Sequence, residues 1–253
     1  MDTLLKLKDI SFAYHSLNGE IPALTNVSFD VKNGEFLAIV GPSGCGKSTL
    51  LSIIARLLKP ETGTIYVENP DGLIRYPAIG YMLQHDHLFD WRTIYRNVIL
   101  GLEIEHLLTD ERLEKVNHLL KEYGLYPFKD KKPNELSGGM RQRAALIRTL
   151  ALEPDILLLD EPFSALDYQT RLSVSNDICQ IIRHTGKTAI LITHDLSEAI
   201  SIADRIIVLS KRPGTVKRII PISLGTTFKT PLEARNAVEF REYFNLLWKE
   251  LET

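Results

Sequence analysis

The segment that most constrains this chain is Gly41–Thr49, which reads GPSGCGKST. It fits the spacing G-x-x-x-x-G-K-[ST], in which glycines let consecutive backbone N–H groups converge on phosphate oxygens. The short apolar run Phe36–Val40 precedes it, and a helical pattern from Lys47 to about Leu58 follows. A loop between a strand and a helix places the positive end of the helix at a bound anion. The sequence therefore predicts an α/β protein that binds nucleotide phosphates.

Each position of this loop is a predicted nucleotide contact. From its charge and reach, Lys47 is expected at the β- and γ-phosphates, and the Ser48 hydroxyl is expected on Mg²⁺. By chance the fixed positions would co-occur in roughly one chain in a hundred of this length, and the strand–loop–helix context makes chance rarer still. The full set of predicted contacts in the loop is Gly41, Pro42, Ser43, Gly44, Cys45, Gly46, Lys47, Ser48 and Thr49.

Composition excludes several other classes of protein. The chain has 253 residues and a formal net charge of -2, so it carries no basic footprint for nucleic acid. Its longest apolar runs are about five residues, whereas a membrane-spanning helix needs ~20. The N-terminal stretch is interrupted by charges and does not resemble a signal peptide. Of the two cysteines, Cys45 lies within the phosphate loop, where a structural disulfide is not expected. This cysteine usage favours a reducing, cytoplasmic setting.

Short apolar runs alternate with helical stretches along much of the chain. They recur at Ile156–Leu159, Ala189–Thr193 and Ile206–Leu209, and a further strand is expected around Ile79–Leu83. This alternation predicts a parallel sheet with helices on its faces. The N-terminal 35 or so residues read instead as strands and turns, with a strong turn signal at Asn18-Gly19.

The middle of the chain is expected to be helical. Residues 93–152 contain helix patterns and no convincing strand, including a helix capped by Thr109 and stopped by Gly124. The predicted organisation is a catalytic core from residues 1–90 and 155–224, a helical insertion over 91–154, and a short tail over 225–253. The tail is expected to hold one amphipathic helix near Phe240–Leu251.

Two carboxylates follow one of the predicted core strands. The run Ile156–Leu159 ends in Asp160 and Glu161, and ligands of open α/β sheets bind outside the carboxyl ends of the strands. Asp160 is a candidate Mg²⁺ ligand, and Glu161, which points differently, is a candidate general base for an attacking water. The alternative is that both residues merely begin a loop.

A second glycine motif carries a family resemblance. The segment LSGGMRQR, residues 136–143, resembles the signature motif of ATP-binding cassette (ABC) transporter ATPases. Other motifs of that family occur in the expected order along residues 4–224. Tyr14 resembles the aromatic residue that stacks on adenine, and Gln84 resembles the glutamine of the Q-loop. Asp160-Glu161-Pro162 resembles the end of the Walker B motif, Ser164-Ala165-Leu166-Asp167 resembles the D-loop, and His194 resembles the switch histidine. The resemblance implies a P-loop NTPase core with an N-terminal antiparallel β-subdomain and an inserted α-helical subdomain.

The resemblance also implies a shared active site. Two copies would pack head to tail, so that Ser137, Gly138 and Gly139 of one cap the ATP held by the other. Catalytic roles would fall to Glu161, His194 and Gln84, with Gln84 also near Mg²⁺. For each residue a structural alternative stands beside the functional one: a glycine-rich turn at 137–139, a helix cap at Thr193-His194-Asp195, a surface glutamine at position 84 and a core aromatic at Tyr14.

Three functional classes compete for such a chain. A P-loop kinase would leave the signature motif, Glu161 and His194 unexplained. Soluble ABC ATPases of ribosomes usually carry two cassettes, and those of DNA repair insert a long coiled coil before the signature. The preferred interpretation is the ATPase subunit of a transporter, peripheral on the cytoplasmic face of the membrane, with a separate permease. An exporter subunit and a soluble ABC ATPase remain the alternatives.

Two longer stretches point to import. FDWRTIYRNVILGLE, residues 89–103, and DRIIVLSKRPGTVKRIIPISL, residues 204–224, resemble segments of importers of nitrate, sulfonates and taurine, although Asp90 replaces an expected proline. This implies a small solute delivered by a binding protein. The apolar-aromatic cluster His85, Leu88, Phe89 and Trp91 is a candidate groove for a permease helix, or else buried packing. A metal site at His85-x-His87 and a redox role for Cys45 are both disfavoured.

Overall fold

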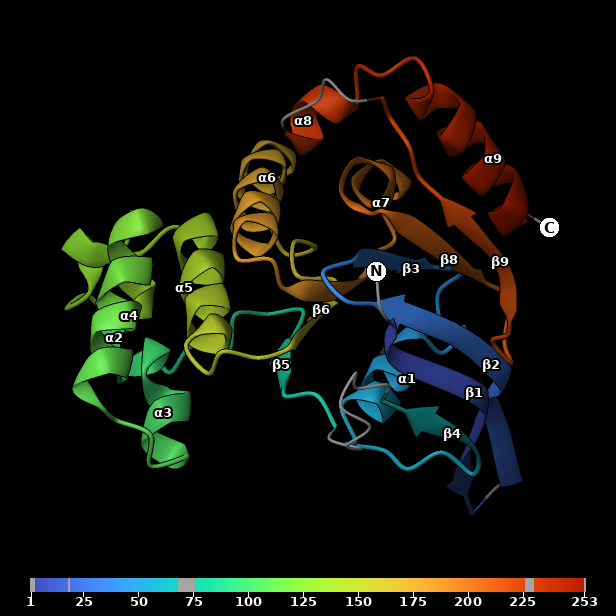
Figure 1. Ribbon diagram of the computed structural model, residues 1–253, viewed down its shortest axis with the longest axis horizontal. Coiled ribbons are helices and arrows are strands. Elements are labelled where there is room, and N and C mark those ends of the chain that lie inside the picture. Colours follow the sequence, from blue (N-terminus) through green and yellow to red (C-terminus); the bar gives the residue numbers. More distant parts are fainter. Residues whose placement is uncertain (1–2, 18, 68–75, 226–229, 253) are drawn as a thin grey trace. The chain divides into compact units, whose positions relative to one another are not determined.

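The computed structural model describes residues 3–17, 19–67, 76–225 and 230–252. It divides into two compact units (Figure 1), the first formed by Met1–Pro77 with Ile182–Thr253 and the second by Ala78–Ile181. The predicted turn residue Asn18 lies outside the described residues. The predicted division into catalytic core, helical insertion and tail follows other boundaries, and it stays a prediction.

The first unit contains an antiparallel sheet near the N-terminus. Its strands are β1 (Thr3–Ser16), β2 (Gly19–Lys32) and β4 (Thr62–Tyr66), in the order β2-β1-β4. Leu5, Leu7 and Ile10 of β1 are buried, so this sheet turns one apolar face inward.

A second, mainly parallel sheet carries the phosphate loop. It contains β7 (Thr188–Ile192), β3 (Phe36–Val40), β8 (Arg205–Leu209) and β9 (Val216–Pro221), in that order. Every residue of β3 and β7 is buried, as expected for parallel strands that are covered on both faces. Only β9 runs antiparallel to its neighbour, and neither it nor β4 was predicted.

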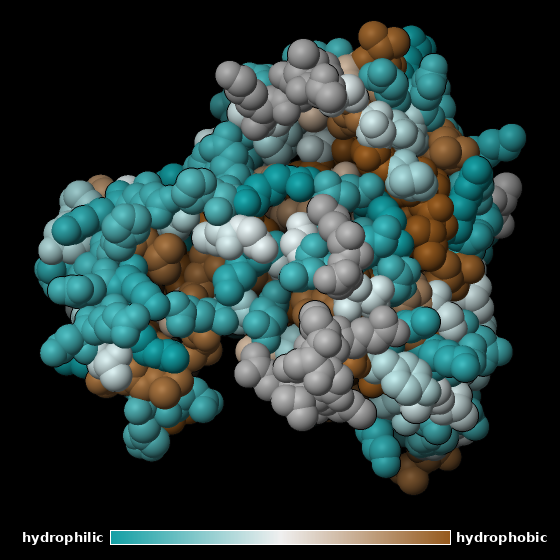
Figure 2. Space-filling model, viewed as in Figure 1, coloured by the Kyte–Doolittle hydropathy of each residue, from teal (hydrophilic) through white to brown (hydrophobic). Residues whose placement is uncertain are grey.

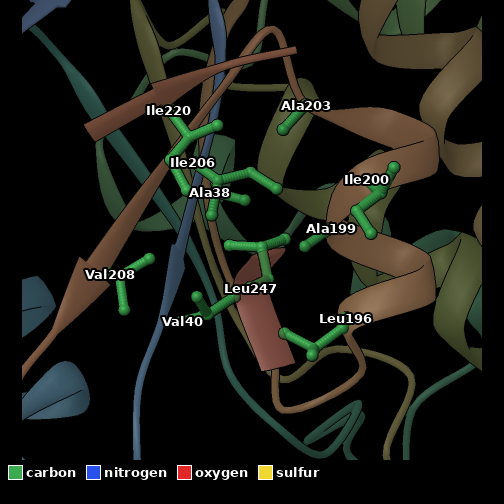
Figure 3. Packing of buried hydrophobic residues seen from close by; sticks show 10 residues of the cluster. All are labelled: Ala38, Val40, Leu196, Ala199, Ile200, Ala203, Ile206, Val208, Ile220 and Leu247. Carbon is green, nitrogen blue, oxygen red and sulfur yellow. The ribbon is translucent and has the colours of Figure 1, made fainter. Parts of the chain in front are cut away.

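The described part of the first unit also contains the helices α1 (Lys47–Ile54), α7 (Leu196–Ile202), α8 (Pro231–Ala234) and α9 (Phe240–Glu252). Helix α1 ends at Ile54, short of the predicted Leu58. Helix α9 matches the predicted amphipathic helix and belongs to the core. Leu247 of α9 lies among side chains of α7 and the strands, including Ala199 and Ile206 (Figure 3).

The second unit combines two parallel strands with helices. Its elements are β5 (Ile79–Met82), α2 (Ile94–Val98), α3 (Leu100–Ile104), α4 (Asp110–Glu122), the 3-10 helices η1 (Tyr126–Phe128) and η2 (Pro133–Glu135), α5 (Gly138–Leu150), β6 (Ile156–Asp160) and α6 (Tyr168–His184), whose last turn belongs to the first unit. Residues 93–152, all of them described, contain helices and turns without a strand, as predicted.

Helix α4 shows how the sequence pattern becomes structure. The Thr109 side chain accepts a hydrogen bond from Arg112 N, and Gly124 follows the helix with a φ of 70°. Only Val116 and Leu120 of α4 are buried, and the face over α4 is mainly hydrophilic in Figure 2.

The mixed α/β fold, with an antiparallel β-subdomain, a parallel core sheet and a helical segment, confirms the predicted fold class.

Candidate functional site

The phosphate loop joins the end of β3 to the start of α1 in the first unit. Gly46 adopts a φ of 104°, and an added Cβ would lie 2.7 Å from Leu24 Cδ2 and 2.8 Å from the Ala23 carbonyl oxygen. Lys47 is almost fully buried, and its Nζ donates hydrogen bonds to the carbonyl oxygens of Gly41 at 2.9 Å and Pro42 at 3.0 Å. The loop therefore folds around the lysine ammonium, with a glycine where only a glycine fits.

Cys45 sits inside this loop as a buried side chain. Burial raises the pKa of its thiol, and this effect exceeds the opposing influence of the Lys47 ammonium. Its sulfur lies 4.0 Å from Lys47 Nζ. These properties agree with a small packing residue rather than a reactive thiolate.

Tyr14 on β1 is partly exposed and tied to the nucleotide loop. Its hydroxyl shares a 2.9 Å hydrogen bond with Thr49 Oγ1 in the first turn of α1, and its ring meets Phe12 edge to face. At 43% exposure the residue is not a core aromatic, so part of its surface is open to a ligand. The link to Thr49 was not expected from the sequence, because it joins residues of two different motifs.

His194 leaves the sheet at the same edge as the phosphate loop. Strands β3 and β7 are parallel neighbours with Ile39 opposite Ile192, so both chains emerge at their carboxyl ends on that edge. His194 is exposed, and Asp195 is the residue that caps α7, with its Oδ1 accepting from the backbone N–H groups of Ser197 and Glu198. Within the predicted cap segment Thr193-His194-Asp195, the side chain that caps α7 is therefore that of Asp195.

The second unit holds Gln84, Asp160 and Glu161. Strands β5 and β6 are parallel with Met82 opposite Leu159, so Gln84 and Asp160 follow the same sheet edge. Tyr81 Oη donates to Asp160 Oδ2 at 3.4 Å. Glu161 adopts a φ of 46°, a left-handed conformation that is rare for a glutamate. No pattern in the sequence indicates this strained backbone at Glu161.

The signature residues begin helix α5. Ser137 caps the helix by accepting a hydrogen bond from Met140 N at 3.3 Å. A Cβ at Gly139 would lie 2.6 Å from Val174 Cγ2, and one at Gly138 would lie 3.0 Å from Leu166 Cδ2. Both glycines therefore let neighbouring side chains pack closely on the first turn of α5.

Two arginines of α5 connect the signature with the segment after Gln84, a link that the sequence did not suggest. Arg141 Nε donates to Asp86 Oδ2 at 3.0 Å, and its NH1 group donates to the Leu136 carbonyl oxygen at 2.9 Å. Arg148 donates to the carbonyl oxygens of Asp86 and His87, both at 2.8 Å. Since Asp86 lies far from α5 in sequence, spacing alone could not pair these residues.

The apolar-aromatic cluster splits into buried and exposed parts. Leu88 is buried, whereas Phe89 and Trp91 are exposed with ring centroids 4.6 Å apart. The fully buried Asn97 fixes this segment, since its Oδ1 accepts from Phe89 N at 2.7 Å and its Nδ2 donates to the Phe89 and Thr93 carbonyl oxygens. A polar residue on the apolar face of α2 is the signal that could have revealed this role.

The described residues were also compared with what a side-chain metal site and a membrane-spanning helix require. Among the described residues, no group of three or more His, Cys, Asp or Glu side chains could hold a metal ion, so His85 and His87 do not belong to such a cluster. Within the same residues, no helix has the length and apolar character needed to cross a membrane.

Comparisons with known proteins extend these observations. Residues 24–164 match the family model described as "ABC transporter". The uncharacterized ABC transporter ATP-binding protein YtlC of Bacillus subtilis (strain 168) is 45% identical over 249 residues, covering 98% of this chain and 96% of that protein. The nitrate import ATP-binding protein NrtD of Synechocystis sp. is 40% identical over 227 residues, covering 90% and 85%.

A solved structure resembles most of this chain. It is the dimeric, post-hydrolysis state of the ATP-binding cassette MJ0796 bound to ADP and Pi, with a TM-score of 0.72, 36% identity, and coverage of 88% of this chain and 100% of that one. The fold, the glycine-lined loop beneath Lys47 and the matches over most of the chain lead to the same conclusion. The chain belongs to the ABC transporter family and is an ATP-binding, ATP-hydrolysing subunit of such a transporter.

Proposed function

We propose that this ATPase powers the import of a small solute, of the nitrate, sulfonate or taurine kind, through a separate membrane permease. The observation that carries the nucleotide part is the phosphate loop, in which Lys47 lies over a turn that admits only glycine at Gly46. The import part is supported by the 40% identity to a nitrate import protein over 85% of its length. It is also supported by the two importer-like segments at residues 89–103 and 204–224.

In this proposal the residues of each unit have separate tasks. Lys47 and the loop amides bind the phosphates, and the Tyr14 ring stacks on adenine. Glu161 accepts a proton from the attacking water, and His194 donates to the γ-phosphate. Gln84 takes part in contacts with the metal and the water.

Magnesium fits the residues available for it. Ser48, Asp160 and Gln84 offer hydroxyl, carboxylate and amide oxygens, which are the hard ligands that Mg²⁺ prefers. Mg²⁺ is usually held by one or two carboxylates together with substrate phosphates and water, rather than by a cage of protein side chains. When bound, the ion would neutralise charge on the phosphate groups.

The proposed active state is a dimer of two copies. The similarity to a dimeric cassette supports it, and the N-terminus of α5 at Ser137 is a second place where a helix could meet an anion. Ser137, Gly138 and Gly139 of one copy would enclose the ATP bound by the other. The dimer would sit peripherally at the cytoplasmic face of the membrane and act on the permease, which receives solute from a binding protein.

The test is Glu161→Gln. The variant should bind ATP, lose hydrolysis by ~10²-fold or more because the proton acceptor is gone, and accumulate as a dimer with ATP. Phosphate release and light scattering after size exclusion measure the two effects. Glu153→Gln is the control, since Glu153 also has a positive φ of 52° but ion-pairs with Lys115. Normal hydrolysis by Glu161→Gln would contradict the role of Glu161.

A further inference from the structure

The turn between β8 and β9 is part of the importer-like segment, yet none of the proposed steps uses it. Gly214 N donates to the Ala23 carbonyl oxygen at 2.9 Å, and Thr25 N donates to the Gly214 carbonyl oxygen at 3.0 Å. Arg212 Nε donates to the Pro22 carbonyl oxygen at 2.9 Å. The turn is therefore attached to β2 through both its backbone and a guanidinium group.

The turn is also fixed internally. Thr215 N donates to Ser210 Oγ at 2.9 Å, and Ser210 N donates to the Thr215 carbonyl oxygen at 3.0 Å. These two bonds join the first and last residues of the turn. They limit how far the backbone at Gly214 can shift without moving the rest of the turn.

Gly214 contacts the phosphate loop directly. A Cβ added at Gly214 would lie 2.2 Å from the Cys45 carbonyl oxygen, which is backbone and cannot rotate away. The loop also meets the same segment of β2 directly, because a Cβ at Gly46 would lie 2.8 Å from the Ala23 carbonyl oxygen. The Cys45–Gly46 stretch thus packs against β2 and against a turn that is itself bonded to β2, with no space for a methyl group at either contact.

We propose that Gly214 is a positioning residue for ATP, because it sets where the Cys45–Gly46 backbone lies and hence where the loop N–H groups point. Arg212 supports it by holding the turn on β2. This inference rests on the proposed role of the loop in binding phosphates. Anything larger than glycine at position 214 would push the Cys45 carbonyl and displace the adjoining amides.

The test is Gly214→Ala, measured by titration with MgATP and by thermal unfolding. The dissociation constant should rise by about tenfold or more, because losing even one well-aligned hydrogen bond to a charged phosphate oxygen weakens binding by roughly that factor. Gly186→Ala is the matched control. Gly186 has a φ of 63° with no atom near an added Cβ, and it precedes β7 at the sheet edge opposite the phosphate loop. This control should lower the melting temperature and leave ATP affinity unchanged.

A second pair of variants avoids adding a Cβ. Arg212→Gln removes the bond to Pro22, and Lys211→Gln removes an equal charge from the same turn. Arg212→Gln should weaken MgATP binding by a smaller factor than Gly214→Ala, whereas Lys211→Gln should not. If Gly214→Ala fails to fold, this pair decides the question.

The outcomes separate this inference from the proposed function. Lys47→Ala should weaken ATP binding, and unchanged affinity there would overturn the assignment of the phosphate loop itself. If Lys47→Ala weakens binding while Gly214→Ala or Arg212→Gln matches its control, the loop assignment stands and the positioning role of the turn is wrong.

Discussion

At the scale of single residues, Cys45 combines two opposing influences. A helix N-terminus and a nearby ammonium lower a thiol pKa, whereas burial raises it, and burial prevails here. The side chain is 1% exposed, so reagents also reach it poorly. Its chemistry is therefore set by packing, which agrees with the sequence-based preference for a small residue over a redox-active thiol.

We expect native Cys45 to react with iodoacetamide far more slowly than a free thiol at pH 8. Because the pKa is raised, the thiolate fraction at any pH near 8 is smaller than in a free cysteine, and reactivity should rise only at higher pH. Mass spectrometry of the peptide that contains Cys45 measures the rate. Denatured protein, in which both cysteines should react quickly, is the control. Fast labelling of the native chain would contradict the prediction.

The motif residues could be proposed from the sequence, since each has a fixed spacing and a chemical reason for its type, and their roles stay predictions. The sequence did not suggest the contacts that hold these residues in place. Tyr14 bonds to Thr49 and Arg141 bonds to Asp86, and each pair joins distant segments without any local pattern. Such partners depend on tertiary packing, which a single sequence does not show.

At the scale of elements, Asn97 links helix α2 to the segment that carries Phe89 and Trp91. We expect Asn97→Ala to reduce the free energy of unfolding by about 1–3 kcal/mol, because Phe89 N would lose its acceptor inside the protein. Urea unfolding measures this loss. Acrylamide quenching of Trp91, in a Trp248→Phe background, should show greater exposure of the segment.

Asn134→Ala provides the comparison, because Asn134 is exposed in η2. It should leave stability and quenching near those of the parent chain. Equal behaviour of the two variants would mean that Asn97 does not fix the segment.

The elements that escaped prediction have physical features in common. Strand β4 reads TGTIY and is largely exposed, so it lacks the apolar run that marked the core strands. Strand β9 is exposed along most of its length and pairs at an edge. By contrast, β3, β6 and β7 are buried apolar runs, and the sequence predicted these strands most directly.

At the scale of the whole molecule, the exposed pair Phe89 and Trp91 bears on the proposed permease contact. We expect Trp91→Ala to reduce co-purification with the permease of the transporter, and to reduce permease-stimulated hydrolysis, since a large apolar anchor would be lost. Trp248→Ala is the control, because Trp248 is also exposed but belongs to α9. Co-purification of Trp91→Ala at the level of the control would contradict the docking role.

The left-handed backbone at Glu161 has a consequence for how such a chain can change over evolution. A non-glycine residue in this conformation costs of order 1–3 kcal/mol. Glycine would relieve most of that cost, so Glu161→Gly should raise the melting temperature while hydrolysis falls with loss of the carboxylate. A melting temperature of Glu161→Gly at or below that of the parent chain would contradict this expected exchange of activity for stability. If it holds, selection for thermal robustness alone would discard this glutamate, and its retention would mark a site where activity outweighs stability.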